Sequence, residues 1–150
     1  EYVRAETFGS LDPNDQYIAN CIGDGLTKPW YGNVWLNPPY SSGNIDTFVR
    51  KVIHEAPSVD RMLVLVNSAT DTAWFHSLLN NAQAVLFYRR RVKFWKMFNG
   101  KAHDLWVSST NGKIVNNPRY LNTLFMFARE DLQSEFYHVY NERGTIIYPT

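Results

Sequence analysis

Hydrophobic positions in the middle of the chain follow two alternating patterns. Residues 34–36, 62–66 and 84–88 form short apolar runs with many β-branched and aromatic side chains, which is typical of strands buried on both faces of a sheet. Between these runs, apolar residues recur every three or four positions, as they do along one side of an amphipathic helix. The alternation of strands and helices predicts a doubly wound α/β sheet that is mostly parallel.

The sequence marks where the first predicted helix ends and where the second one begins. The first is expected to end before Pro57, since a proline forces the residue before it out of the helical region; its apolar side consists of Ile45, Phe48, Val49, Val52 and Ile53. Asp71 is expected to cap the second helix by accepting hydrogen bonds from free backbone amides. The apolar side of that helix consists of Trp74, Phe75, Leu78 and Leu79. His76 lies beside this aromatic stripe, which favours a packing or surface role over catalysis.

Smaller elements are predicted towards both ends of the chain. Near the start, the pattern predicts a strand over residues 7–11 and a helix over 16–21. After residue 100 it predicts a loop over 108–117, a strand over 120–127, a short helix around 136–139 and a last strand over 145–148.

The stretch with the clearest chemistry is Asn37-Pro38-Pro39-Tyr40, directly after the first apolar run. The prolines fix the backbone and remove two amide donors, so the turn presents carbonyl oxygens. The side-chain oxygen of Asn37 and the carbonyl of Pro38 can accept the two hydrogens of a planar amino group and aim its lone pair at an electrophile. The ring face of Tyr40, rather than its hydroxyl, is expected to stack on the substrate. This tetrapeptide resembles the amino-methylation motif of S-adenosylmethionine-dependent methyltransferases; the alternative is a proline turn that only ends a strand.

Composition limits the remaining possibilities. A chain of 150 residues that is 45% hydrophobic is expected to form one compact domain over residues 1–150. The single cysteine, Cys21, excludes an internal disulfide and a cysteine-based zinc site, and no signal peptide or uninterrupted membrane span is recognisable. A cytoplasmic setting is therefore expected. A net charge of +1 does not by itself indicate a nucleic-acid partner.

Basic residues are nevertheless concentrated after residue 88, with no acidic residue before Asp104. Aromatic residues alternate with them, and this mixture is typical of nucleic-acid binding because cations neutralise phosphates and aromatic rings contact bases. The candidate DNA-binding residues are Arg89, Arg91, Lys93, Phe94 and Lys96, within a DNA-contacting segment of about residues 89–120. The alternative is a solvated, charged strand edge.

Candidate cofactor residues are less distinctive. A carboxylate after a first strand is a common ligand for a nucleotide-like cofactor, which makes Asp12 a candidate, with a helix N-cap as the equal alternative. Asp24 is a candidate for the adenine amine of a cofactor, with Gly25 allowing a close backbone approach, although a plain Asp-Gly turn fits equally well. No G-x-G loop is present. The full candidate set for cofactor binding is Phe8, Asp12, Pro13, Asp24, Gly25, Leu26 and Asn37.

Several of these segments, in this order, resemble the phage-type, Dam-related DNA N6-adenine methyltransferases. The resemblance covers nearly the whole chain and rests on Leu11-Asp12-Pro13, Asp24-Gly25-Leu26, Pro29-Trp30-Tyr31-Gly32, residues 34–41 around the tetrapeptide, Ala69-Thr70-Asp71-Thr72, Trp74-Phe75-His76, Arg91-Val92-Lys93-Phe94 and Asn117-Pro118-Arg119-Tyr120. It implies a Rossmann-like methyltransferase fold and transfer of a methyl group from S-adenosylmethionine to adenine N6 in double-stranded DNA. By position, it implies catalysis by Asn37, Pro38, Pro39 and Tyr40.

The resemblance also implies that adenine is extruded from the duplex, because N6 cannot be reached within the base stack. No metal is required, since the cofactor carries the leaving group. Family members usually carry a further segment before the position of Glu1 that helps to close the cofactor pocket, and the chain between Asp12 and Asp24 is too short for the strand that supplies a ribose-binding carboxylate. One alternative is therefore a DNA-binding fragment without catalytic activity. Another is methylation of a different planar amine, either cytosine N4 or a protein glutamine amide, because the turn recognises a planar amino group and not a particular ring.

Overall fold

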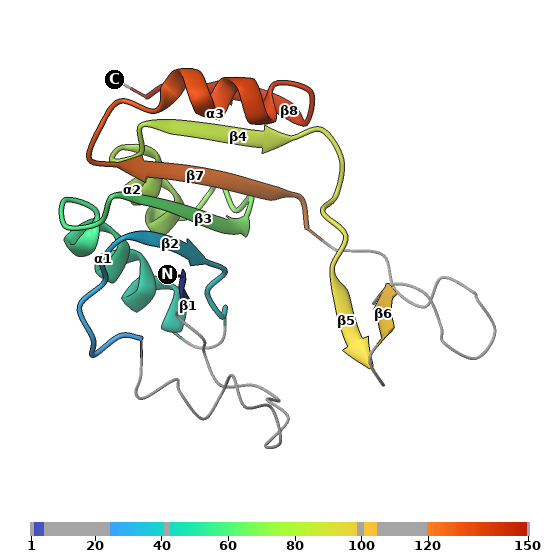
Figure 1. The fold of residues 1–150 in the computed structure, drawn as a ribbon, viewed down its shortest axis with the longest axis horizontal. Coiled ribbons are helices and arrows are strands. Elements are labelled where there is room, and N and C mark those ends of the chain that lie inside the picture. The colour runs from blue at the N-terminus through green and yellow to red at the C-terminus, as the bar shows by residue number, and fades with distance from the viewer. Residues whose placement is uncertain (1, 5–24, 41–42, 99–100, 105–119, 150) are drawn as a thin grey trace.

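The computed structural model describes residues 2–4, 25–40, 43–98, 101–104 and 120–149 of the chain (Figure 1). The elements within these residues are β1 (Tyr2–Arg4), β2 (Asn33–Leu36), α1 (Asn44–Glu55), β3 (Arg61–Asn67), α2 (Ala73–Leu79), β4 (Ala84–Tyr88), β5 (Trp95–Phe98), β6 (Lys101–Asp104), β7 (Asn122–Ala128), α3 (Gln133–Tyr140) and β8 (Gly144–Ile147). The helices and strands predicted from residue 34 to residue 88 are confirmed, and so are the late strands and the late helix. The strand predicted over 7–11, the helix over 16–21 and the loop over 108–117 lie outside the described residues.

Six of the described strands form one mixed sheet in the order β1-β2-β3-β7-β4-β8. The β1·β2 and β2·β3 pairs are parallel, whereas β7 pairs antiparallel with both β3 and β4, and β8 pairs antiparallel with β4. The expectation of a mostly parallel sheet is therefore wrong for strand pairing. It fails because β7 lies between β3 and β4, which the sequence order alone would make neighbours. Strands β1 to β4 still run in one direction.

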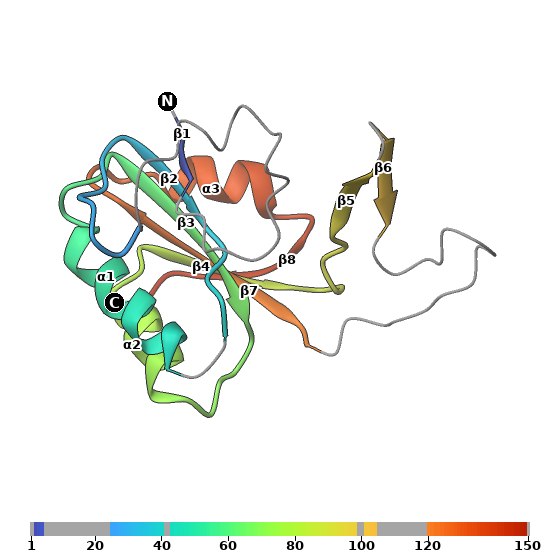
Figure 2. The same cartoon turned by 90° about the horizontal axis from the view of Figure 1, so that it is seen from below.

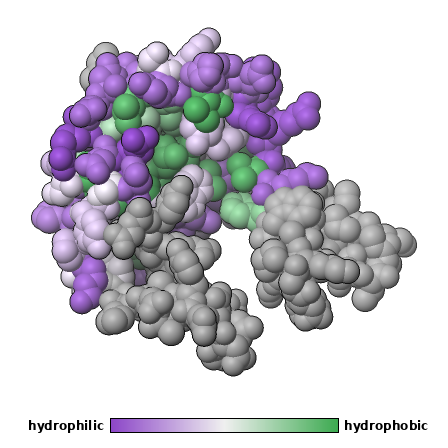
Figure 3. Space-filling model, viewed as in Figure 1, coloured by the Kyte–Doolittle hydropathy of each residue, from purple (hydrophilic) through white to green (hydrophobic). Residues whose placement is uncertain are grey.

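Helices cover both faces of this sheet: α1 and α2 lie on one face and α3 on the other (Figure 2). Successive side chains of a strand therefore enter different cores. In β3, Val64 and Val66 pack with the α1 and α2 side, whereas Leu65 packs with Phe136 of α3. This double coverage explains why the central strands are unbroken apolar runs rather than alternating ones. On the outside, most of the described surface in this view is hydrophilic, and hydrophobic side chains gather near the middle of the face (Figure 3).

Neither α1 nor α2 begins with a side-chain cap hydrogen bond. Gly43, with φ of 74°, precedes α1 in the left-handed region that glycine adopts without steric cost. Before α2, Thr72 is extended and the helix begins only at Ala73. The prediction that Asp71 caps this helix is therefore wrong, because Thr72 occupies the cap position and no side chain makes a cap hydrogen bond there. The Thr72 hydroxyl instead donates to the carbonyl of Ala69 at 2.7 Å.

Strands β5 and β6 pair antiparallel as a separate two-stranded sheet between β4 and β7 in the chain. Both ribbon views place this pair beside the main sheet rather than on either of its faces (Figures 1 and 2). The basic segment predicted from the sequence therefore begins at the end of β4 and continues into β5.

Candidate active site

One edge of the main sheet gathers the candidate functional residues. The carboxyl ends of β2, β3 and β4 meet at this edge because these strands run in the same direction. The antiparallel strands β7 and β8 begin at the same edge, since Asn67 at the end of β3 pairs with Asn122, and Tyr88 at the end of β4 pairs with Gly144. The turn at residues 37–40, the end of β3 and the basic segment therefore share one side of the molecule, which is where ligands bind in α/β sheets.

The turn at residues 37–40 leaves β2 directly after Leu36, a residue that is 1% exposed. Asn37 is exposed, Pro38 is buried and Pro39 is half-buried. Within the described residues, neither the Asn37 side chain nor the Pro38 carbonyl is engaged in a hydrogen bond. The buried Pro38 ring thus fixes the turn while two neighbouring acceptors remain available to a donor.

Tyr40 connects this turn to the next strand and to α2. The backbone amide of Asn67 donates a hydrogen bond to the Tyr40 hydroxyl at 2.6 Å, and the Tyr40 ring centroid lies 6.4 Å from that of Trp74 in α2. Burial raises the pKa of Tyr40 to about 12, although the Asn67 amide acts in the opposite direction. The hydroxyl therefore stays protonated at neutral pH, and Tyr40 as a whole residue is 39% exposed.

The end of β3 that holds Tyr40 is itself fixed to β7. The Ser68 amide donates to the Leu121 carbonyl at 2.8 Å, and the hydroxyls of Ser68 and Thr123 are 2.7 Å apart. Thr123 is fully buried and Ser68 is half-buried, so solvent is largely kept from this polar pair. The tyrosine is consequently attached to a strand end that its pairing with β7 holds in place.

The candidate cofactor residues divide into two groups. Phe8, Asp12, Pro13 and Asp24 lie outside the described residues. Gly25 is described, and its carbonyl accepts a hydrogen bond from the indole of Trp30 at 2.8 Å, while Leu26 packs against the core on the α1 side. The carboxyl end of β1 lies beside β2, since Arg4 pairs with Trp35, two residues before Asn37.

A buried carboxylate anchors the segment that contains Gly25 and Leu26. Glu55, at the end of α1, is only 5% exposed and accepts hydrogen bonds from the Trp30 amide at 3.1 Å and from Lys51 at 2.5 Å. The Lys51 ammonium also lies 5.6 Å from the centre of the Trp30 ring. Burial alone would raise the pKa of Glu55, but the Lys51 and Trp30 hydrogen bonds hold the pKa below its ordinary value. Sequence analysis missed this anchor, because residues 30 and 55 carry no shared local pattern.

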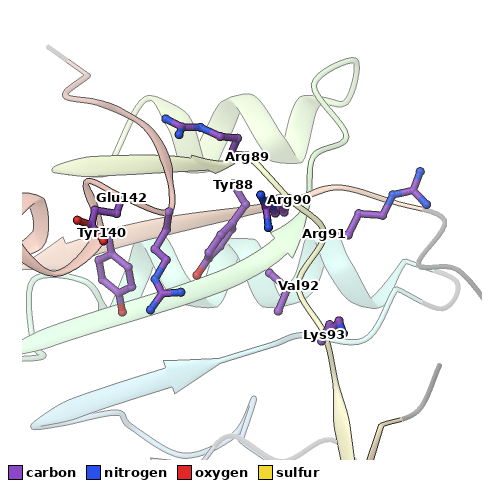
Figure 4. Close-up of a pocket in the computed structure, with 9 residues that line it drawn as sticks. Tyr88, Arg89, Arg90, Arg91, Val92, Lys93, Tyr140 and Glu142 are labelled. Carbon is purple, nitrogen blue, oxygen red and sulfur yellow. The ribbon is translucent and has the colours of Figure 1, made fainter. Parts of the chain in front are cut away.

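Three of the five candidate DNA-binding residues lie around an open hollow of about 520 Å³ (Figure 4). Arg89, Arg91 and Lys93 line it and are exposed. Phe94 is half-buried and packs against the core on the α3 side, and Lys96 lies in β5, where only the backbone is described. The structure thus brings three of the five predicted residues together. It adds four residues that the sequence analysis did not assign to any site: Tyr88, Tyr140, Glu142 and Arg143.

The described residues offer few other candidates for a catalytic, metal-binding or membrane-spanning role. His76 is exposed, and its Nε2 lies 2.9 Å from the Thr70 carbonyl, in agreement with the surface role expected for it. Among the described residues, no three His, Cys, Asp or Glu side chains are grouped closely enough to hold a metal ion. No described helix combines the length and apolar character needed to cross a membrane.

Two comparisons with known proteins point to the same family. A family model described as DNA N-6-adenine-methyltransferase (Dam) matches residues 15–116. A DNA N-6-adenine-methyltransferase of Escherichia phage T1 is 35% identical over 71 residues, which make up 45% of this chain and 27% of the phage protein. The chain therefore spans well under half of that relative, and no solved structure matches it significantly. Because the family model covers more than half of its residues, the chain belongs to the Dam family of DNA N-6-adenine-methyltransferases.

Proposed function

We propose that this chain transfers a methyl group from S-adenosylmethionine to N6 of an adenine that has been flipped out of double-stranded DNA. The observation that carries the proposal is the position of Asn37-Pro38-Pro39-Tyr40 at the carboxyl end of β2, with Tyr40 tied to the end of β3. Family membership and the name of the phage T1 relative support adenine as the target base.

Asn37 and Pro38 orient the amino group. The exposed Asn37 side-chain oxygen and the Pro38 carbonyl accept its two hydrogens, which turns the nitrogen lone pair away from the ring and towards the methyl donor. Positive charge develops on the nitrogen as its bond to the methyl carbon forms, and both oxygens stabilise that charge. The bond between the methyl carbon and the donor sulfur breaks in the same step, and the nitrogen then gives one proton to water, so the product is neutral N6-methyladenine.

Tyr40 holds the extruded base. Unpairing and unstacking a base costs a few kcal/mol, so the protein must offer a replacement for the lost stacking. Stacking on an aromatic side chain contributes about 1 to 3 kcal/mol. The hydrogen bond from Asn67 fixes the far end of the Tyr40 ring, and the fixed ring loses little conformational freedom when the base arrives.

Among the described residues, Asn37 fits a role in holding S-adenosylmethionine, because its exposed amide lies beside the carboxyl end of β1 and both accepts and donates hydrogen bonds. Gly25 and Leu26 lie in the segment that Trp30 and Glu55 attach to α1, which suits a fixed wall of a cofactor site. When bound there, S-adenosylmethionine supplies an electrophilic methyl group on a sulfonium leaving group. Asp12 and Asp24 stay candidates for the same site by resemblance. We assign the fold to the Rossmann-like methyltransferases on the same basis, supported by the common direction of β1 to β4.

Methylation of cytosine N4 or of a protein glutamine amide would use the same turn, because the turn recognises a planar amino group and not a particular ring. The concentration of cations at the end of β4 favours DNA over a protein substrate. Replacing Arg89, Arg91, Lys93 and Lys96 with alanine should flatten the dependence of log affinity for duplex DNA on log salt by about one unit for each lost phosphate contact. An unchanged slope would favour the protein substrate.

The decisive experiment is a methyl-transfer assay with labelled S-adenosylmethionine and duplex DNA, followed by digestion and nucleoside analysis. N6-methyladenine is the expected product. Label in N4-methylcytosine or in added protein would identify one of the alternative substrates. DNA binding without any incorporated label would identify a DNA-binding fragment that has no catalytic activity.

A further inference from the structure

We propose that the hollow at the end of β4 binds a backbone phosphate of the DNA, with Arg143 from the α3–β8 connection as a principal ligand. This inference rests on the proposed function, and it extends the DNA-binding surface beyond the basic segment of residues 89–96. Neither the sequence pattern nor the comparisons assign a role to Arg143, which lies outside the residues that the family model matches.

Backbone contacts bring Arg143 to this place. The Arg89 amide donates to the Arg143 carbonyl at 2.9 Å, and the Arg143 amide donates to the Tyr140 carbonyl at 2.9 Å. The next residue, Gly144, is buried opposite Tyr88, where a Cβ would lie 1.9 Å from the Phe87 carbonyl oxygen. The glycine thus permits a close approach between β8 and β4, and the arginine is held beside the basic segment by the fold rather than by its own side chain.

The lining of the hollow suits a phosphate. The residues that line it include a single acidic residue, Glu142, and five basic residues: Arg89, Arg90, Arg91, Lys93 and Arg143. Guanidinium groups match the geometry of phosphate oxygens and bind them with two parallel hydrogen bonds. An excess of positive charge around a concave surface also attracts a polyanion from a distance.

Two phenols complete the lining. Tyr88 and Tyr140 come from β4 and α3 and pack against the same core cluster. Burial raises the pKa of both hydroxyls, so they stay protonated at neutral pH and can donate hydrogen bonds to phosphate oxygens.

The position of the hollow fits a phosphate that flanks the target base. Along the sheet edge, β4 and β8 are three and four strands from β2, which corresponds to about 14 to 19 Å at the usual spacing of neighbouring strands. At about 3.4 Å per nucleotide along one strand, this equals roughly four to six base pairs. The hollow is therefore too far from Asn37 to hold the phosphate of the flipped adenine itself, and it suits duplex that continues beyond the target.

The arrangement of the cations favours a DNA backbone over a free phosphate ion. Arg89 and Arg91 extend to different sides of the chain instead of converging on one point (Figure 4). A hollow of about 520 Å³ is also much larger than a single phosphate and falls in the range of sites that hold drug-sized ligands. Spread cations over an open surface bind successive phosphates of one strand, with Arg143 and the phenols contacting one of them.

The first test measures binding of duplex DNA by the full chain as a function of salt concentration. The Arg143→Ala variant should flatten the slope of log affinity against log salt by about 0.9, the value for one lost phosphate contact. Arg143→Lys should keep the slope because it keeps the charge. Arg61→Ala is the matched control, since Arg61 is exposed at the opposite edge of the sheet, at the amino end of β3, and its removal should leave the slope unchanged. An Arg143→Ala slope equal to that of wild type would overturn the proposal.

The second test locates the phosphate. Duplexes carrying one uncharged methylphosphonate at successive positions should bind wild type more weakly at a position about four to six base pairs from the target adenine. Arg143→Ala should be insensitive to the substitution at that position and should respond normally elsewhere. Equal sensitivity of wild type and variant at every position would refute the contact.

A third arm separates the two sources of phosphate. Inorganic phosphate should compete with DNA only to the extent that its ionic strength explains, as shown by a matched chloride control. Tight, saturable binding of inorganic phosphate that Arg143→Ala abolishes, without an effect of Arg143 on DNA affinity, would identify a free-anion site and overturn the DNA contact. These binding measurements need no methyl transfer, so their failure is distinguishable from failure of the proposed activity.

Discussion

The backbone amide of Asn67 donates a hydrogen bond to the hydroxyl of Tyr40 across 2.6 Å, although the two residues are 27 positions apart in the chain. This bond joins the carboxyl ends of β2 and β3, the two strands that each carry an asparagine to the same edge. Tyr40 was expected to contact the substrate through its ring face alone. Its hydroxyl has a separate role, because it attaches the side chain to the end of β3. The bond has a direct consequence for substitutions at position 40.

Tyr40→Ala should weaken binding of the extruded base by about 1 to 3 kcal/mol, because the stacking surface is lost. Tyr40→Phe should keep most of the methyl-transfer rate, since it keeps the ring, and should lower the stability of the fold by about 1 kcal/mol or less through the lost hydrogen bond. Single-turnover rates together with thermal unfolding would separate the two effects. Stacking is the wrong role for Tyr40 if the phenylalanine variant is as inactive as the alanine variant.

Asn37→Ala should lower the methyl-transfer rate by roughly two to three powers of ten, because one acceptor that stabilises the developing charge is removed. Affinity for DNA should change little, since the amino group is the only part of the DNA that Asn37 is proposed to contact. Asn33→Ala is the matched control: Asn33 is exposed on the same strand but at its opposite end, away from the turn. Full activity of a folded Asn37→Ala protein, as judged by circular dichroism, would exclude the catalytic assignment.

The buried Glu55 should make stability depend on pH in acid. Its folded-state pKa is lower than the ordinary value of 4.5, so its stabilising effect is fully present above pH 4.5 and is lost as the pH falls through the lower, folded-state pKa. Glu55→Gln should therefore unfold more easily than wild type at pH 7, by about 1 to 3 kcal/mol, and the difference should shrink in acid. Urea unfolding at several pH values would measure this difference.

Glu130→Gln serves as the control for Glu55, because residue 130 is exposed and its side chain makes no ion pair within the described residues. Its unfolding free energy should follow that of wild type at every pH. A Glu55→Gln deficit that persists undiminished below the folded-state pKa would mean that packing, rather than the carboxylate charge, explains the loss.

Gly144→Ala should destabilise the fold by roughly 1 to 3 kcal/mol, because the added methyl group would lie 1.9 Å from the Phe87 carbonyl oxygen and would force β8 away from β4. Thr145→Ala, at the exposed neighbouring position, should change stability by much less. Thermal unfolding of both variants checks the prediction. Wild-type stability of Gly144→Ala would show that β8 shifts without cost, and the close approach would then not be what places Arg143.

The sequence by itself determined the elements that depend on local patterns. Unbroken apolar runs at 62–66 and 84–88 predicted strands buried on both faces, and these became β3 and β4 between two helical layers. The spacing of Ile45, Phe48 and Val52 predicted α1, because a helix that buries one side carries apolar residues every three or four positions. The tetrapeptide at Asn37 indicated chemistry because backbone restriction by proline is a local property.

Only the tertiary structure decided which distant residues meet. It placed β7 between β3 and β4, moved the start of α2 beyond the reach of Asp71, and set Glu55 against Trp30 and Arg143 beside Arg89. No periodic pattern or short motif in the sequence predicts these contacts, because strand order and loop packing depend on how all segments are buried together. The tetrapeptide was therefore recognisable in the sequence, whereas its support from Asn67 and the full lining of the basic hollow required the fold.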